Sequence, residues 1–336
     1  MKYVLNQSKI KTTNNYKINN IELDLSIPNV SDFKEFKVNS DKVEIKKEII
    51  NNFKSEIGLE FDKCYRLEMN VKNNIDEPII IEYDFDDSKI LVNEIDLNLE
   101  ESADFIIKYK SEKEVFNNVK LIVKAKDNVN ANISVVNLLD CNSNSFIAVE
   151  NYLQKNAKVK LNFIDLGGKS KISNIYSKLE GDNSLFTLNN IYLGLNEDII
   201  DMNYYIEILG KNADGKIMTE GVLNDYSKKS FKGTLDFIKG CTNSNGEELE
   251  NVILLSDTCK SKSLPMLLCH EEDVTGSHGV STGKIDESKL FYLMTKGLTE
   301  KEAIKLIISS NLNKIISEIS NQNIKNEILN IIENKL

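Results

Sequence analysis

The sequence predicts a mainly β protein that ends in a short helical segment, and three observations support this. From Pro78 to about Ile285, short runs rich in Val, Ile, Phe and Tyr begin roughly every 10–15 residues, separated by clusters of Asn, Asp, Gly, Ser and Lys. After Asp286 the apolar residues instead recur with helical spacing. The 336 residues, 41% hydrophobic and 28% charged, suffice to bury a large core.

Residues 1–75 predict a small α/β region. The run IELDLSIP alternates between apolar and polar residues, as a strand does. The stretch from Asp32 to Phe61, which contains KKEIINNFKSEIG, has the apolar spacing of one short helix.

Residues 76–285 predict a β domain, for which a sandwich, a barrel and a solenoid are all compatible. A hairpin-based sandwich favours Asn-Gly or Asp-Gly turns, because these residues tolerate positive φ, but such pairs do not recur between most runs. A solenoid turns through short corners, which suits the frequent Asn and the isolated Gly. Periodicity alone leaves the sandwich nearly as well supported.

Residues 286–336 predict three short helices. Asp286 can cap the first, ESKLFYLMTK, and Gly297 stands where a helix ends in the left-handed conformation. Thr299 and Glu302 have capping-box spacing and open the second. Its expected apolar stripe is Ala303, Leu306, Ile307, Ile315, Ile316 and Ile319. The segment IKNEILNIIENKL predicts the third.

Composition argues against several classes of function. The net charge of −10 repels nucleic acid and anionic membranes, and the near-absence of arginine, with Arg66 alone, removes the usual phosphate-binding fork. Without an apolar leader region or a run of about 18 apolar residues, we expect a cytoplasmic protein with no membrane partner. Five cysteines without CxxC spacing fit reduced thiols better than a disulfide framework.

The run LLCHEEDVTGSHG, residues 267–279, concentrates the candidate chemistry and holds both histidines, His270 and His278. If residues 267–274 form a strand, alternation places Cys269, Glu271 and Asp273 on one face and His270 and Glu272 on the other. These five side chains would then point to both faces of the strand and could not bind one metal ion together. His270 is expected to be partly exposed and paired with a carboxylate. His278 would need another strand or another chain to complete a metal site.

Two further motifs in this region give weak signals. The run GSHGVSTGK resembles a phosphate loop, but Gly279 and Gly283 have only three residues between them and Ile285 follows the lysine, so no bound nucleotide is expected. Glu271 and Asp273 on one strand face would lie about 7 Å apart, which suits an inverting glycosidase. A β-helix carbohydrate-active enzyme is therefore one alternative, although sparse aromatic residues argue against it.

The region from about Ser230 to Ile308 resembles the C-terminal core of the SufB/SufD family of iron–sulfur cluster assembly proteins. The resemblance is carried by SFKGTLDFIKG and by NVILLSDTCKSKSLPMLLCHEEDVTGSHGVSTGKIDESKLFYLMTKGLTEKEAIKLII, whose motifs keep the family order. It implies a right-handed parallel β-helix and a non-catalytic scaffold subunit. The implied partners are a SufB-like paralogue, or a second copy when the chain is alone, and a SufC-like ABC-type ATPase that hydrolyses ATP.

The resemblance also implies which residues act. The Ser277-His278-Gly279 form is SufD-like, whereas Glu250 stands where SufB has a cluster-associated cysteine, and Gly276 stands where SufD often has one. His278 is therefore the candidate ligand or transfer residue for a transient, shared iron–sulfur cluster. Cys269, Cys259 and Glu272 are further candidates. The ATPase would dock on Leu290, Phe291, Tyr292, Leu293, Lys296 and Gly297. A SufB-like scaffold that itself holds the cluster is the alternative within the family.

Overall fold

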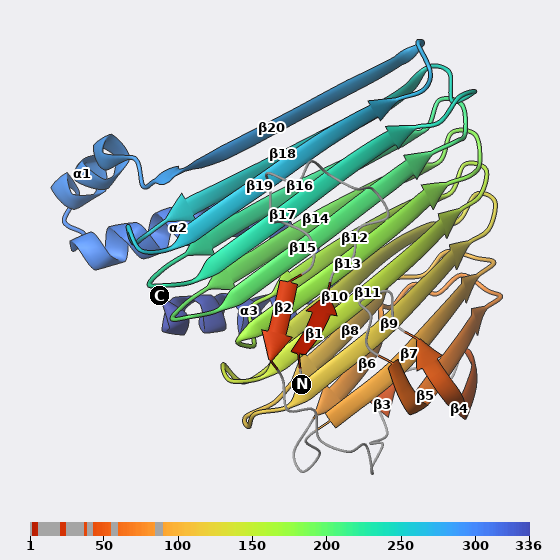
Figure 1. Cartoon of the computed structure of the whole chain (residues 1–336), viewed down its shortest axis with the longest axis horizontal. Coiled ribbons are helices and arrows are strands. Elements are labelled where there is room, and N and C mark those ends of the chain that lie inside the picture. The colour runs from red at the N-terminus through yellow and green to blue at the C-terminus, as the bar shows by residue number, and fades with distance from the viewer. Residues whose placement is uncertain (1, 6–20, 25–36, 39–42, 55–59, 85–89) are drawn as a thin grey trace.

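The chain folds into a parallel β-solenoid followed by three helices, as a computed structural model shows (Figure 1). The structure describes residues 2–5, 21–24, 37–38, 43–54, 60–84 and 90–336. Two nine-stranded sheets face each other: one runs in the order β20-β18-β16-β14-β12-β10-β8-β6-β3, the other β19-β17-β15-β13-β11-β9-β7-β5-β4. Because the chain alternates between the sheets, each pair of consecutive strands makes one coil. The predicted mainly β solenoid is confirmed, and the sandwich and the barrel are excluded.

The strands that build the coils are mostly about ten residues long. Those before residue 100 are β1 (Lys2–Leu5), β2 (Ile21–Asp24), β3 (Lys37–Val38), β4 (Glu44–Lys54), β5 (Glu60–Val71), β6 (Ile79–Asp84) and β7 (Ile90–Leu99). The middle coils contain β8 (Phe105–Lys110), β9 (Phe116–Ala125), β10 (Asn130–Leu138), β11 (Asn144–Leu153), β12 (Lys158–Asp165), β13 (Ser170–Leu179) and β14 (Leu185–Gly194). The last coils contain β15 (Ile199–Ile208), β16 (Asp214–Leu223), β17 (Lys228–Phe237), β18 (Ser244–Leu254), β19 (Lys260–Cys269) and β20 (Val274–Lys284).

Asparagines at the corners let the chain turn between coils. Asn128, Asn156 and Asn183 have φ values of 63°, 57° and 58°, in the left-handed region that Asn tolerates better than most residues. They also stack: the Asn156 amide donates to the Asn128 side chain at 2.8 Å, and the Asn183 amide donates to Asn156 at 3.0 Å. These partners lie 28 and 27 residues apart, which is one coil. The frequent Asn thus has the corner role expected for a solenoid.

The N-terminal region contains no helix among its described residues, so the predicted helix between Asp32 and Phe61 is wrong. Residues 44–54 form strand β4, which pairs antiparallel with β5. Pairing with a neighbouring strand overrides the weak local helix preference. The apolar spacing in this segment does not mark a buried helix face, since the side chain of Ile49, one of its apolar residues, is 57% exposed. The run IELD forms a strand as predicted, and the following residues 25–36 lie outside the described part.

The three C-terminal helices are α1 (Glu287–Thr295), α2 (Glu300–Ile316) and α3 (Gln322–Lys335). The predicted caps are confirmed: the Asp286 side chain accepts from two backbone N–H groups, Thr299 and Glu302 form a capping box, and Gly297 has φ +97°. The predicted stripe of α2 is partly wrong. Ile308 and Leu312 are buried, whereas Leu306 is 50% exposed.

Helices α2 and α3 cover the outer face of the even-numbered sheet (Figure 1). Apolar side chains that point outward from β8, β10, β12, β14 and β16 form a second core with them. Its members on the strands are Ile106, Val136, Leu138, Ile164, Ile191, Leu193 and Val222, and Leu166, directly after β12, adds to them. Glu327 of α3 adds ion pairs to Lys108 at 2.9 Å and Lys110 at 3.1 Å. The helices are therefore fixed to the solenoid, except for α1, which has no buried residue.

Candidate functional site at the open end of the solenoid

Among the described strands none pairs with the outer edges of the last coil, so the solenoid is open at its C-terminal end. Strand β20 is the edge of one sheet and pairs with β18, while β19 is the edge of the other and pairs with β17. Most residues of β20 are exposed, in contrast to the mostly buried residues of β17. An open edge offers unpaired backbone groups, which another chain can extend by strand addition.

His278 lies in the middle of β20, at the same register position as Glu248 of β18. On β18, Gly246, Glu248 and Glu250 are buried and alternate with more exposed residues, so they face the interior of the solenoid. In-register residues of neighbouring parallel strands point to the same side. His278 is therefore exposed at the mouth of the solenoid, on its interior side.

The two cysteine candidates lie at opposite ends of β19. Cys259 precedes this strand, and its Sγ lies 2.9 Å from the Ser256 carbonyl oxygen, whereas Cys269 is the last residue of the strand and is exposed. A ten-residue strand spans about 30 Å, so the two thiols cannot bind one ion together. Of the two, Cys269 lies at the corner that leads into β20 and is the more accessible thiol.

Residues 270–273 form a corner instead of continuing the strand, so the alternation assumed for them is wrong. The Glu271 carboxylate accepts from the backbone N–H groups of Gly240 at 3.0 Å and Glu272 at 2.9 Å. These bonds, that of Gly240 foremost, lower the pKa of Glu271. Glu271 thus stabilises a corner and does not share a strand face with Asp273, which removes the geometric basis of the glycosidase alternative. The side chain of Glu272 is exposed.

The other histidine and the glycine-rich run also have structural roles. His270 is 61% exposed, with Nε2 3.5 Å from an oxygen of the Asp236 carboxylate, so its expected pairing with a carboxylate is confirmed. The run GSHGVSTGK lies within the extended strand β20, where its backbone pairs with β18. A phosphate loop needs backbone N–H groups that converge on one point, which a strand does not offer.

A buried ion pair lies inside the solenoid, one coil behind the open end. Lys229 of β17 places Nζ 2.5 Å from Oε1 of Glu250, and neither side chain has exposed surface. The same Nζ donates to Ser263 Oγ at 2.8 Å and to the Lys262 carbonyl at 3.3 Å. Burial lowers the pKa of Lys229, and the charge of Glu250 opposes this shift. Glu250, the position at which the family resemblance implies a cysteine in SufB-type chains, is therefore fully engaged in a structural contact.

Glu248 is a second buried carboxyl beside this pair. Its side chain is 0% exposed, and neither oxygen has a hydrogen bond of good geometry within the described residues. Burial, together with the charge of Glu250, raises the pKa of Glu248 to about 8, and the Met266 backbone N–H offsets part of this rise. The carboxyl lies over Gly233, where a Cβ would come within 2.0 Å of Oε1.

These interior charges were not predicted from the sequence. In SNGEELENVIL the apolar Leu249 and Ile253 lie on one face of the strand, which suggests that Glu248 and Glu250 on the other face point to solvent. In the structure the glutamates point into the solenoid and Leu249 points outward. The outward face of β18 lies close to α2, where Leu249 lines a cavity together with Ile315. The neighbouring strand β16 offers a clue to this orientation. Its buried Gly215 and Ile217 are in register with Gly246 and Glu248 of β18, so these residues of both strands face the interior.

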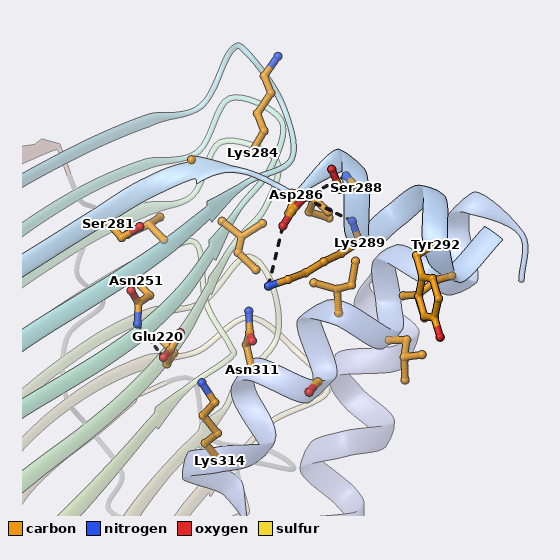
Figure 2. A pocket seen from close by; sticks show the side chains of 18 residues that line it. Glu220, Asn251, Ser281, Lys284, Asp286, Ser288, Lys289, Tyr292, Asn311 and Lys314 are labelled. Carbon is orange, nitrogen blue, oxygen red and sulfur yellow. Dashed lines mark hydrogen bonds and ion pairs between the residues drawn. The ribbon is translucent and has the colours of Figure 1, made fainter. Parts of the chain in front are cut away.

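The surface expected to bind an ATPase lies on α1 and beside it. Phe291 is 69% exposed and Tyr292 59%, while Leu290 and Leu293 are half-buried. Lys296 is exposed, with Nζ 5.2 Å from the centre of the Tyr292 ring, and Gly297 ends the helix. A groove of about 950 Å³ separates α1 and α2 from the end of the even-numbered sheet. Figure 2 shows Glu220 and Asn251 on the sheet side of this groove and Asn311 and Lys314 on α2.

Within the described residues, no group of three or more His, Cys, Asp and Glu side chains is placed to hold a metal ion. The mouth of the solenoid instead offers separate donors: the imidazole of His278 and the thiol of Cys269. Among the helices that the structure describes, none has the length and apolar character needed to cross a bilayer.

Comparison with known proteins identifies the family. Residues 87–311 match the family described as "SUF system FeS cluster assembly, SufBD core domain". The SufD protein of Bacillus subtilis is 30% identical over 165 residues, which cover 49% of this chain and 38% of that protein. The SufD protein of Escherichia coli is 22% identical over 171 residues, covering 51% and 40%. An iron-sulfur cluster assembly SufBD family protein of Pyrococcus horikoshii is 29% identical over 166 residues, covering 49% and 36%.

These three alignments each cover less than half of the relative's length. The matched family region nevertheless spans more than half of this chain and includes all the coils from β7 to β20. The SufD-like character suggested by Ser277-His278-Gly279 agrees with the two SufD proteins among the relatives. The chain therefore belongs to the SufBD core family of the SUF system for iron–sulfur cluster assembly.

Proposed function

We propose that this chain is a SufD-like, non-catalytic scaffold subunit that pairs with a SufB-like paralogue at the open end of its solenoid. The observation that carries this proposal is the accessible edge of β20, with His278 on its interior side. A paralogue with its own open end can add its edge strands there, and a second copy of this chain is the alternative partner. Pairing would bring donor groups of the two subunits together around His278.

The iron–sulfur cluster is the cargo of this assembly and is shared between subunits. His278 supplies an imidazole donor, and Cys269 is a further candidate at the same end. Because clusters are held mostly by thiolates, the remaining ligands come from the paralogue. The alternative is that this chain alone holds the cluster, with His278 and either Cys269 or Cys259 as ligands. The two thiols lie at opposite ends of β19, so only one of them could take part, and a single thiolate leaves the cluster short of ligands.

The ATPase partner docks on α1. This helix has no buried residue, and it exposes an aromatic pair, Phe291 and Tyr292, of the kind enriched in protein interfaces. ATP-driven closure of the partner would pull α1 and, through Ile285, the end of β20. The interface that holds the cluster would then change its shape. Nucleotide binds to the partner in this mechanism.

A pull-down with purified SufC-like ATPase tests the docking surface. Phe291→Asp should abolish capture, because it places a charge in the centre of the apolar contact. Ile49→Asp is the matched control, since Ile49 is similarly exposed at 57% but lies on β4, at the other end of the solenoid. Equal capture of both variants, or failure of the wild-type chain to bind with and without nucleotide, would refute this function.

A further inference from the structure

Helix α2 has a second apolar face, which turns away from the core that it shares with the solenoid. Its buried residues, among them Ile308 and Leu312, pack against the even-numbered sheet. Leu306 and Ile307 instead line the groove between α1, α2 and the end of that sheet, and Leu306 is 50% exposed. Exposed apolar side chains that gather in one groove indicate a surface for another protein segment.

The floor of this groove is also apolar. It contains Ile253 at the end of β18 and Ile285 directly after β20, with Leu293 of α1 on the far side, and all three are half-buried. Beside them, β20 contributes only Ser281 and Gly283, and a Cβ built on Gly283 would meet no other atom. The last strand therefore leaves the floor of the groove open.

The groove continues the layer of helices that covers the even-numbered sheet (Figure 1). Helices α2 and α3 bury the outward apolar residues of the strands from β8 to β16, whereas β18 and β20 extend the sheet further. An amphipathic helix laid in the groove beside α2 would cover the ends of these two strands and bury Leu306. A helix is therefore the segment that this shape fits best.

The rim of the groove is basic. Lys289 of α1 and Lys314 of α2 are exposed on two of its sides, and Figure 2 shows both side chains directed toward the space between α2 and the sheet. The carboxylates that line the groove have contacts of their own. Glu220 accepts from the Asn251 amide at 3.0 Å, and Asp286 accepts from the first turn of α1.

This basic character is local. Residues 287–316 contain five lysines and three glutamates, whereas the whole chain has a net charge of −10. Partner surfaces bring opposite charges together, so a basic groove on an acidic protein favours an acidic partner.

We propose that the groove binds an acidic amphipathic helix of a partner protein. The apolar face of this helix covers Leu306 and the floor, and its carboxylates pair with Lys289 and Lys314. The site does not rest on the proposed function, because Phe291, the centre of the expected ATPase surface, lies outside the residues that line the groove.

The test is fluorescence anisotropy of the full-length chain with a fluorescein-labelled helical peptide that has leucines on one face and glutamates on the others. We expect saturable binding that weakens as salt is added, because salt screens exposed charges. Leu306→Asp should lower the affinity at least about tenfold through the lost apolar contact. Lys289→Glu and Lys314→Glu should each lower it about fivefold. A second peptide, with lysines in place of the glutamates, should not bind.

Three control variants should bind the acidic peptide as the wild type does. Ile49→Asp replaces an apolar side chain of similar exposure, 57%, on β4. Lys211→Glu reverses an exposed charge in the corner before β16, whereas the groove lies at the end of that strand. Phe291→Asp separates the groove from the ATPase surface. Thermal denaturation reports whether each variant folds, and the lysine variants carry the test if Leu306→Asp does not.

Three results would overturn the proposal: no binding of the acidic peptide by the folded wild-type chain, equal binding of both peptides, or wild-type affinity in both lysine variants. Sedimentation tests the other occupant. A wild-type dimer that Leu306→Asp converts to a monomer would mean that a second copy fills the groove, and the proposal would be wrong. Peptide binding without capture of the ATPase would contradict only the proposed function.

Discussion

Lys229 and Glu250 form an ion pair inside the solenoid, with Nζ 2.5 Å from Oε1 and no exposed surface on either side chain. Ser263 Oγ donates to the second oxygen of Glu250, and the Tyr192 hydroxyl lies 3.3 Å from the first. The pair therefore joins β17 and β18 with β19 of the last coil. It stabilises the end of the solenoid at which we place the subunit interface.

Removal of one partner of this ion pair should destabilise the chain strongly. Lys229→Met leaves Glu250 buried without a cation, so we expect the free energy of unfolding to fall by about 3–5 kcal/mol in urea denaturation. Lys228→Met is the control on the preceding, exposed position, and should change stability by less than about 0.5 kcal/mol.

The double variant Lys229→Met/Glu250→Leu checks the cause. It removes both charges and should recover much of the loss, because the cost comes from the unpaired carboxylate. A double variant as unstable as Lys229→Met would show that shape, not charge, dominates at this position.

Asp165 should make stability depend on pH. Burial raises its pKa to about 6, although the charge of Lys171 and the hydrogen bond from the Asn137 amide favour the ionised form. The folded chain thus holds this proton more tightly than the unfolded chain does. Its contribution is fully present below pH about 4 and is lost as the pH rises through about 6.

Asp165→Asn removes this titration. The difference in unfolding free energy between wild type and variant should change by roughly 3 kcal/mol between pH 4 and pH 7, at about 1.4 kcal/mol per pKa unit. Urea denaturation across this range measures it. A difference that stays constant with pH would mean that Asp165 titrates alike in the folded and unfolded chain.

The corner asparagines should be replaceable by glycine but not by alanine. Asn156 has φ +57°, and its side-chain amide forms hydrogen bonds to the asparagines of both neighbouring coils. Asn156→Ala loses these bonds and adds a backbone penalty of about 1–2 kcal/mol, whereas Asn156→Gly avoids the penalty. Thermal denaturation should therefore rank the wild type first, glycine second and alanine last. Equal stability of the two variants would contradict the conformational role.

Sequence patterns predicted the parts of the fold that local chemistry determines. The β-branched runs became strands, the asparagines became corners, and Asp286 and Thr299 capped their helices. Features that depend on distant contacts were missed. The helical spacing before Phe61 gave way to pairing between β4 and β5, because a paired strand satisfies the backbone equally well.

The candidate site was predictable only in part for the same reason. His278 was found from its flanking residues, and the structure places it at the open end. Glu248 and Glu250 were not expected in the interior, because the apolar residues on the other face of β18 looked like the core-facing ones. Those residues instead lie near α2, a helix some 50 residues further along the chain. Alternation alone cannot say which face of a strand is covered by a helix.

The most direct test of the central claim is the iron and acid-labile sulfide content of the complex assembled anaerobically from this chain, a SufB-like paralogue and the SufC-like ATPase. His278→Ala should leave the three proteins associated while lowering both iron and sulfide. His270→Ala, the other histidine, should match the wild type because His270 pairs with Asp236 away from the interior. Full iron and sulfide in His278→Ala would contradict the claim that the open end holds the shared cluster.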